Sequence, residues 1–272
     1  MRGVLGPALL FVSALPLSGC ASALKEPPPL PHLGGGGTQT PAASVASLLS
    51  QADVLYAART LESVRRAAET WLQAARTDSS RIEGLLGSAR AQVWLSDHEQ
   101  EPATREASAT LAVQSAQWCL RVAPESAGCL YYLGAGLGVQ AREKRSTALD
   151  ALPRIEQAFL DAAGRDPELD EAGPDRALAL LYLRAPGWPT GPGDPDRGLE
   201  HARKALELRP GYPPNLLALA EALTATGDAG GARESYSRAL ELARGRKAAG
   251  DPDAFEWIRE AESALEAAPS GP

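Results

Sequence analysis

The sequence predicts an all-α protein, a helical repeat solenoid of about five helix pairs with a C-terminal capping helix. Strand-forming residues are scarce, since the 272 residues include three Ile, nine Val and only 5% aromatic residues. Hydrophobic residues instead recur at the spacing of one helical face, and the same arrangement of small and large residues returns after 34 residues. These observations argue against an all-β protein and against a parallel sheet.

Composition and charge narrow the class of partner. The formal net charge is −7, with 27 Lys and Arg against 34 Asp and Glu, so the chain has no positive surplus to neutralise phosphates. A nucleic acid is therefore not the expected partner. The three His and three Cys residues form none of the paired patterns of a metal site, and the sequence indicates neither a metal nor a cofactor.

Residues 1–19 have the features of a secretory signal peptide. Arg2 supplies positive charge, and the apolar stretch Val4–Leu15 is too short to remain as a membrane-spanning helix. The tetrapeptide Leu17-Ser18-Gly19-Cys20 resembles the bacterial lipobox, in which a thiol directly after the cleaved bond receives diacylglycerol. The resemblance implies a mature protein that begins at a lipidated Cys20. An ordinary signal peptide, cleaved near Ala21 or Ala23, is the alternative.

The segment after the lipobox is expected to be a tether, residues 20–42. Pro27–Pro29 and Gly34–Gly37 can bury no core and favour neither helix nor strand. Its reach is roughly 25 Å as a flexible coil and about 70 Å when fully extended, so the folded body can stand off the bilayer. Ala21 follows Cys20 where an Asp would resemble an inner-membrane retention signal. The expected location is the cell envelope, at the outer membrane facing the periplasm.

The clearest repeat unit runs from Pro213 to Arg244. Gly227 and Asp228 mark a turn between two helices, because glycine tolerates the left-handed conformation that ends a helix. Small residues let paired helices approach closely, and large residues fill the space between neighbours. The residues at these positions resemble the tetratricopeptide repeat: Leu216, Leu219, Ala220, Leu223, Ala232, Tyr236, Ala239 and Leu240.

The second-helix signature of this unit recurs along the chain. It lies 34 residues earlier at Ala205 and Leu206, and again at Ile155, Phe159, Ala162 and Pro167, at Ala112, Ala116, Cys119 and Pro124, and more weakly at Ala67, Trp71, Ala74 and Ser79. The expected first helices are Ala43–Ala58, Ile82–Leu95, Ala127–Val139, Pro174–Leu183 and Pro213–Ala225. Asp253–Ala267 is expected to be a polar capping helix, which places the repeat domain at residues 43–268. A generic antiparallel bundle is the alternative.

Two insertions interrupt the repeats, around Gln140–Pro153 and at Arg184–Asp194. Insertions in a solenoid collect on loops, often on the binding face. The second insertion holds Trp188 between two Pro-Gly turns. Trp188 is either a rigid aromatic anchor for a partner or a plug that folds back into the gap left by the insertion.

Part of the repeat region resembles a known family. The resemblance is carried by Gly173–Leu183, Ala185–Pro189, Gly193-Asp194 and Asn215–Glu221, and extends more loosely over Ala43–Leu242. The family is the tetratricopeptide lipoprotein associated, as the T component, with tripartite ATP-independent periplasmic (TRAP) transporters. The resemblance implies a periplasmic protein that docks the transporter's solute-binding protein, with a pore or cleft through the helical body as a ligand route.

No catalytic residue is expected. His98 follows Asp97 in a polar turn, which is typical of helix capping, and His201 lies beside Glu200 and Arg203 on what is expected to be a solvated helix face. The sequence contains no nucleophile elbow and no phosphate-binding loop. The protein is therefore expected not to be an enzyme.

The groove lined by the first helices is the expected partner-binding surface. Its candidate residues are Tyr131, Tyr132, Tyr182, Trp188 and Asn215. Packing inside the fold is the alternative for Tyr132 and Tyr182. Helix entry behind Pro213-Pro214 is the alternative for Asn215.

Cys119 and Cys129 are the thiols that remain once Cys20 is lipidated, and export would place them in an oxidising compartment. Cys119 falls near the end of one helix and Cys129 in the first turn of the next, so their Cα atoms could approach within the roughly 4.4 to 6.8 Å that a disulfide needs. Two separate small buried residues are the alternative.

These observations favour a lipid-anchored periplasmic adaptor that binds a partner protein or an extended peptide. The solute-binding protein of a TRAP-type transporter is the most specific form of this hypothesis. The alternative is a pilotin-like scaffold in outer-membrane assembly or secretion, and an enzyme is a third hypothesis. The lipid anchor is the expected contact with the membrane, and the sequence leaves a homo-oligomer open.

Overall fold

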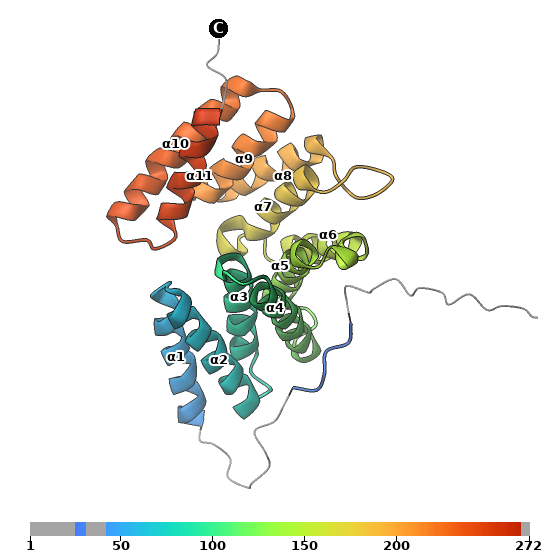
Figure 1. Ribbon diagram of the computed structural model, residues 1–272, viewed down its shortest axis with the longest axis vertical. Helices are drawn as coiled ribbons and strands as arrows, with labels where there is room; N and C mark the ends of the chain where they lie inside the picture. The colour runs from blue at the N-terminus through green and yellow to red at the C-terminus, as the bar shows by residue number, and fades with distance from the viewer. Residues whose placement is uncertain (1–24, 31–41, 268–272) are drawn as a thin grey trace, which may run out of the picture.

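The computed structural model describes residues 25–30 and 42–267 of the chain. Helices make up most of the second range, and they are shown in Figure 1. In chain order they are α1 (Ala42–Ala57), α2 (Leu61–Thr77), α3 (Ile82–His98), α4 (Pro102–Val122), α5 (Ala127–Glu143), the short 3₁₀ helix η1 (Arg145–Thr147), α6 (Ala148–Arg165), α7 (Leu169–Arg184), α8 (Pro195–Leu208), α9 (Pro213–Ala225), α10 (Ala229–Ala248) and α11 (Ala254–Ala267).

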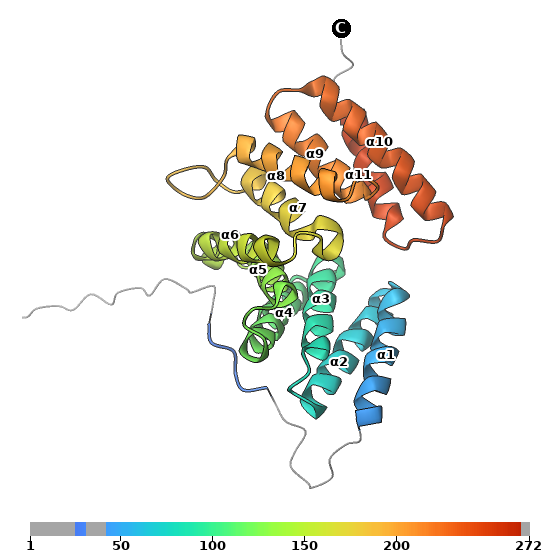
Figure 2. The same ribbon diagram turned by 180° about the vertical axis from the view of Figure 1, so that it is seen from behind.

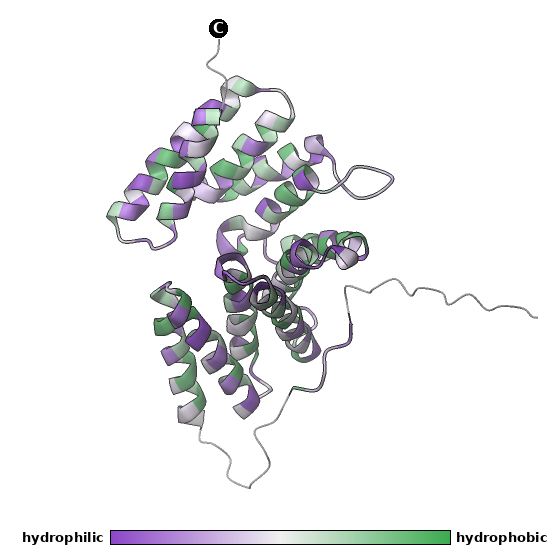
Figure 3. Cartoon of the chain, viewed as in Figure 1, coloured by the Kyte–Doolittle hydropathy of each residue, from purple (hydrophilic) through white to green (hydrophobic). Residues whose placement is uncertain are grey.

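Consecutive helices pack on each other in five pairs, from α1–α2 to α9–α10, and α11 covers the exposed side of the last pair. This arrangement confirms the predicted all-α solenoid of helix pairs with a capping helix. Hydrophobic and hydrophilic residues share each helix, as Figure 3 shows, because one face of the helix packs on its neighbours and the other meets water. None of the helices in the described ranges is both long and apolar enough to cross a membrane.

Local sequence signals set several helix ends. Thr60 and Ser63 form a capping box at the start of α2, and Asp194 and Asp228 accept backbone hydrogen bonds at the starts of α8 and α10. Gly227 adopts a φ of 88° after α9, the left-handed conformation predicted from the sequence.

The insertion expected around Gln140–Pro153 is mostly helical, so the expectation of a loop was wrong there. α5 continues to Glu143, and α6 begins at Ala148 and includes Pro153. The buried side chain of Ala151 packs in the core, which makes extra helical turns favourable at this point. The insertion before Asp194 does form a loop.

α7 contains a left-handed turn before its regular helical part. Asp170, Glu171 and Ala172 have φ values of 50°, 57° and 63°, which non-glycine residues adopt only at an energetic cost. Gly173 and Pro174 follow, and the helix from that point coincides with the predicted first helix of the fourth pair.

The solenoid curves so that its two ends approach each other, as Figures 1 and 2 show. Arg59, in the turn between α1 and α2, donates to Asp253 in the turn before α11, with Nε and Oδ1 2.9 Å apart. His98 Nε2, at the end of α3, lies 2.8 Å from Glu256 Oε1 on α11. These two contacts join the first two helix pairs to the capping helix.

Candidate functional site

A pocket of about 580 Å³ lies on the inner side of the curve, mainly against the first helices of the first four pairs. A cavity of this size is in the range of ligand and side-chain binding sites. Its lining residues are Leu49 and Asp53 of α1, Trp71 of α2, Glu83, Leu86, Gly87 and Arg90 of α3, Gly128 and Tyr132 of α5, and Leu169 and Asp170 of α7.

The apolar part of this pocket is built around Trp71. Its side chain is only 2% exposed and lies 5.3 Å, centroid to centroid, from the ring of Tyr56. A Cβ atom at Gly87 would overlap the Trp71 ring, so only glycine lets α3 pass this close. The tight packing fixes the indole as part of the pocket wall.

One arginine is held against these rings. The guanidinium carbon of Arg90 lies 4.4 Å from the centroid of Tyr56 and 5.1 Å from that of Trp71. Its Nη2 atom is 4.0 Å from Asp53 Oδ1. Arg90 is thus positioned by cation–π contacts and by a carboxylate, which leaves it in a fixed place in the pocket wall.

Three carboxylates and one cation, Arg90, are among the residues that line the pocket, and Arg81 and Arg176 pair with two of these carboxylates from outside the lining. Asp53, Glu83 and Asp170 have side chains that are 66%, 52% and 44% exposed. A hydrogen bond from Arg81 holds the pKa of Glu83 below its usual value, so this carboxyl stays charged at neutral pH. The pocket therefore combines an apolar wall with an acidic rim and suits an apolar side chain that has a positive charge nearby.

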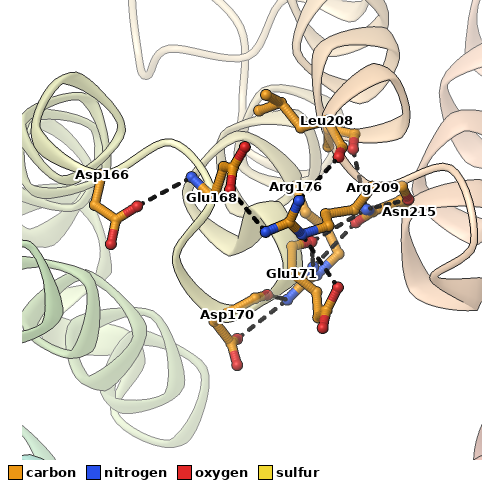
Figure 4. A network of polar contacts seen from close by, with 9 residues as sticks. Asp166, Glu168, Asp170, Glu171, Arg176, Leu208, Arg209 and Asn215 are labelled. Carbon is orange, nitrogen blue, oxygen red and sulfur yellow. Dashed lines mark hydrogen bonds and ion pairs between the residues drawn. The ribbon is translucent and has the colours of Figure 1, made fainter.

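Asp170 is held at the rim by a polar network, which Figure 4 shows. Arg176 donates from Nη2 to the carbonyl and the carboxylate of Asp170, both at 3.2 Å, and from Nη1 to the carbonyl of Glu171 at 3.0 Å. Tyr131 donates its hydroxyl to Asp170 Oδ2 at 2.8 Å. These bonds offset the strain of the left-handed turn and fix the position of the carboxylate.

Asn215 is the buried centre of this network, and the structure does not place it on a partner-facing surface. The side chain is fully buried. Its Nδ2 lies 3.1 Å from the carbonyls of Glu171 and Ala205 and 3.2 Å from that of Arg209, and its Oδ1 accepts from Arg176 at 3.0 Å. The side-chain amide of Asn215 donates hydrogen bonds to carbonyls at the end of α8 and in α7. These bonds join α7, α8 and α9.

The three candidate tyrosines differ in position. Tyr182 is 1% exposed and donates to Glu156 Oε1 at 2.8 Å, so the structure places it inside the fold and not on the surface of the groove. Tyr131 is buried, and its hydroxyl donates a hydrogen bond to Asp170. Tyr132 alone lines the pocket, where burial and the Asp170 charge raise its pKa well above the usual value and keep its hydroxyl protonated.

Trp188 is exposed at the tip of the loop between α7 and α8. Its side chain is 90% exposed, so it does not plug the gap left by the insertion. The loop is closed at its base by a bridge between Gly187 and Gly193, where a Cβ at Gly193 would overlap the Ala185 carbonyl. A pinched loop of this kind presents the indole in a defined place.

His98 and His201, the histidines among the described residues, do not line this pocket. His98 stacks on Trp94 with ring centroids 3.6 Å apart and contacts α11 as described above. His201 was expected on a solvated face, but its Nδ1 lies 2.7 Å from Oδ1 of Asp175, which is only 1% exposed. Burial of Asp175 requires a polar partner, and His201 provides it.

Cys119 and Cys129 are joined by a disulfide in the structure, with Cα atoms 5.7 Å apart. The bond links the end of α4 to the start of α5, and both residues are fully buried. Cys20, the expected site of lipidation, lies outside the described residues. Within those residues, no cluster of three or more His, Cys, Asp or Glu side chains is placed to hold a metal ion.

The fold defined by these helix pairs is a tetratricopeptide-like solenoid. Residues 191–251, which include α8, α9 and α10, match the tetratricopeptide repeat family. A thermophilic tetratricopeptide-repeat protein from Thermus thermophilus has 20% sequence identity and a TM-score of 0.62, with 82% of this chain and 99% of that chain covered. The pilF protein of Pseudomonas aeruginosa has 18% identity and a TM-score of 0.52, with 82% and 92% covered. At these identities the likeness shows the fold alone, and no curated protein matches the chain in sequence.

Sequence reasoning predicted a groove lined by first helices, where the structure has a pocket, but it named only Tyr132 among the residues that line this pocket. Asp53, Glu83 and Arg90 are common helix-surface residues, and they form no local motif. Their positions within the repeat could nevertheless have placed them on the inner faces of first helices, because these faces point away from the paired second helix.

Proposed function

We propose that the protein is a lipid-anchored periplasmic adaptor whose inner pocket binds a segment of a partner protein. The tetratricopeptide-like fold supports a role in protein–protein interaction. The observation that carries the proposal is the pocket itself, in which an aromatic wall formed by Trp71 and Tyr132 lies beside the carboxylates of Asp53, Glu83 and Asp170.

The pocket also defines the chemistry of the segment that would bind. An apolar side chain would fill the space against Trp71 and Leu86, because removal of apolar surface from water supplies most of the binding free energy. A Lys or Arg next to that side chain would face the acidic rim. Arg90 would then pair with a backbone carbonyl or a carboxylate of the same segment.

The partner in this proposal is the solute-binding protein of a TRAP-type transporter. The support is the sequence resemblance between Gly173 and Leu240 to the T component of these transporters. The exposed Trp188 belongs to the same stretch and would add a second contact outside the pocket. A scaffold in outer-membrane assembly or secretion is the alternative, and it predicts a different set of co-purifying proteins.

Affinity capture of the full chain from solubilised membranes tests the proposal. A TRAP-type solute-binding protein should co-purify with the wild-type chain. The yield of this partner should be lower with Trp188→Ala, which removes an exposed ring and leaves the fold intact. Capture of envelope-assembly proteins in its place would support the scaffold. Capture of the same partner at the same yield by Trp188→Ala would exclude the loop from the contact.

A further inference from the structure

A short proline-rich segment lies against the outer side of the solenoid. Residues 25–30, blue in Figures 1 and 2, contact α4, although the two are about ninety residues apart in the chain. The sequence favours a free tether here. The structure shows instead a bound, extended segment without regular secondary structure.

The polar contacts are complementary in donors and acceptors. Gln117 Nε2 donates to the Lys25 carbonyl at 2.9 Å, and Trp118 Nε1 donates to the Pro28 carbonyl at 2.8 Å. Arg121 Nη2 donates to Glu26 Oε1 at 2.9 Å and lies 3.5 Å from the Pro27 carbonyl. Prolines have no backbone N–H and offer only acceptors, whereas the indole and the guanidinium are only donors.

Apolar contacts add to this match. Pro27 is buried, whereas Pro28 and Pro29, which follow it in the chain, are exposed. Leu30 packs against the cluster that contains Leu72, Trp118 and the Cys119–Cys129 disulfide. An aromatic donor that bonds a proline-rich carbonyl beside a buried proline ring is the chemistry of polyproline recognition.

We propose that α4 carries a proline-recognition site and that its occupant is residues 25–30 of the same chain, which act as a fixed strap. This inference adds to the proposed adaptor function and, for its consequence at the membrane, depends on the lipid at Cys20. With the strap bound, five residue steps separate Cys20 from Lys25, which can span at most about 18 Å. The strap, and not the length of the tether, then sets the distance between the body and the bilayer.

The strap also sets which side of the body faces the membrane. It binds α4, the second helix of its pair, whereas the pocket is lined mainly by first helices. The anchored face and the pocket are therefore on different sides of the solenoid. A partner could reach the pocket while the protein stays close to the bilayer.

Cleavage by a protease specific for lysine tests the strap on the full chain. The bond after Lys25 lies inside the bound segment, and the other lysines, Lys144, Lys204 and Lys247, yield products of different mass. Pro27→Gly should speed cleavage after Lys25 by about three- to tenfold. Glycine lacks the ring that is buried when the strap is bound, so the strap should detach more often. Pro29→Gly is the matched control, since it loses the same backbone restraint at an exposed position and should be cut at the wild-type rate.

A second variant tests the site from the side of α4. Arg121→Ala should also speed cleavage after Lys25, while the thermal midpoint of the body stays near the wild-type value because Arg121 is 45% exposed. Equal cleavage rates for wild type, Pro27→Gly and Pro29→Gly would overturn the proposal. Loss of the protection of the Lys25 bond when the protein is diluted would also overturn the proposal, because the strap bound to α4 would then belong to a second copy of the chain. The cleavage assay needs no lipid, so it tests the strap independently of the proposed lipid anchor. The strap can be confirmed even if Cys20 is not lipidated.

Discussion

Trp71 shows how one side chain serves both the core and the pocket. Its ring is buried between α2 and α3, and the same ring forms the apolar wall on the inner side of the solenoid. Gly84 and Gly87 permit this because each presents only a hydrogen atom to the neighbouring helix. A change in this packing should therefore affect stability and partner binding together.

Gly87→Ala should lower the free energy of unfolding by about 1 to 3 kcal/mol, because the new methyl group overlaps the Trp71 ring. Urea denaturation measures the change. The matched control is Gly138→Ala in α5, where no atom lies within 4 Å of the added Cβ. Helix propensity should make this control slightly more stable than wild type, by about 0.5 to 1 kcal/mol. Equal stability of the two variants would contradict the close contact between α2 and α3.

If the protein is exported, as we propose, the disulfide between Cys119 and Cys129 should be present in the protein isolated from cells. Mass spectrometry after alkylation of the denatured, unreduced protein should find both cysteines protected. Reduction should lower the stability by at most about 3 kcal/mol, because the closed loop is short, with a sequence separation of 10 residues. Two alkylated cysteines in protein taken from the periplasm would leave only the packing interpretation.

At the residue scale, the sequence predicted which small residues lie between packed helices better than it predicted the roles of polar residues. The signature positions Ala112, Ala116 and Cys119 are all fully buried, as small residues between helices should be. The sequence analysis interpreted Asn215 as a groove residue or a helix-entry residue and did not single out Asp175. Neither buried polar contact could be predicted, because the partners lie on helices that only the folded chain brings together.

Glu143 is an electrostatic link between helix pairs. Burial alone would raise its pKa, but hydrogen bonds from Arg105 of α4 and Arg142 of α5 outweigh burial and lower it. Arg142 also pairs with Asp97 at the end of α3, with Nη1 and Oδ1 2.6 Å apart. The cluster joins α3, α4 and α5 at one end.

The lowered pKa of Glu143 predicts how stability depends on pH. A carboxyl whose pKa is lower in the folded state adds stability above its unfolded pKa of about 4.3, and this stability is lost as pH falls through the lower folded pKa. Glu143→Gln should therefore have a lower thermal midpoint than wild type at pH 7, and the difference should shrink below about pH 4. Glu69→Gln, at an exposed site on α2, should match wild type at both pH values. A constant difference for Glu143→Gln would contradict the assigned ion pairs.

At the scale of elements, repeat spacing predicted every helix pair, but the exceptions to it were less predictable. The extra turns of α5 and α6 fill the insertion around Gln140–Pro153, since helix and loop are hard to distinguish in a short polar stretch. The left-handed turn at Asp170–Ala172 has no glycine to signal it. It depends on Arg176 and Asn215, which lie later in the chain.

The whole molecule is a curved solenoid whose ends meet through Arg59–Asp253 and His98–Glu256. The sequence cannot indicate this closure, because the first pair of residues is separated by 194 positions and the curvature arises from small rotations between repeats. Closure holds α11 near the first two helix pairs.

The proposed lipid anchor makes a prediction for the whole molecule in the cell. If Leu17–Cys20 is a lipobox, Cys20→Ser should abolish lipidation, because the cysteine thiol is the acceptor for diacylglycerol in that motif. The protein should then move from the detergent phase to the aqueous phase, or stay as an uncleaved precursor, in detergent phase partitioning. A variant with a processed amino terminus that still partitions like wild type would contradict the anchor.

The charge of the pocket tests the adaptor proposal most directly. The measurement is calorimetric titration of the captured partner into wild type, into Asp53→Lys with Glu83→Lys, and into the control Glu69→Lys, which reverses an exposed charge on the second helix α2. An apolar and basic segment in the pocket predicts a loss of at least tenfold in affinity for the double variant, about 1.4 kcal/mol, with little change for the control. Equal affinity for all three proteins would contradict binding in the pocket.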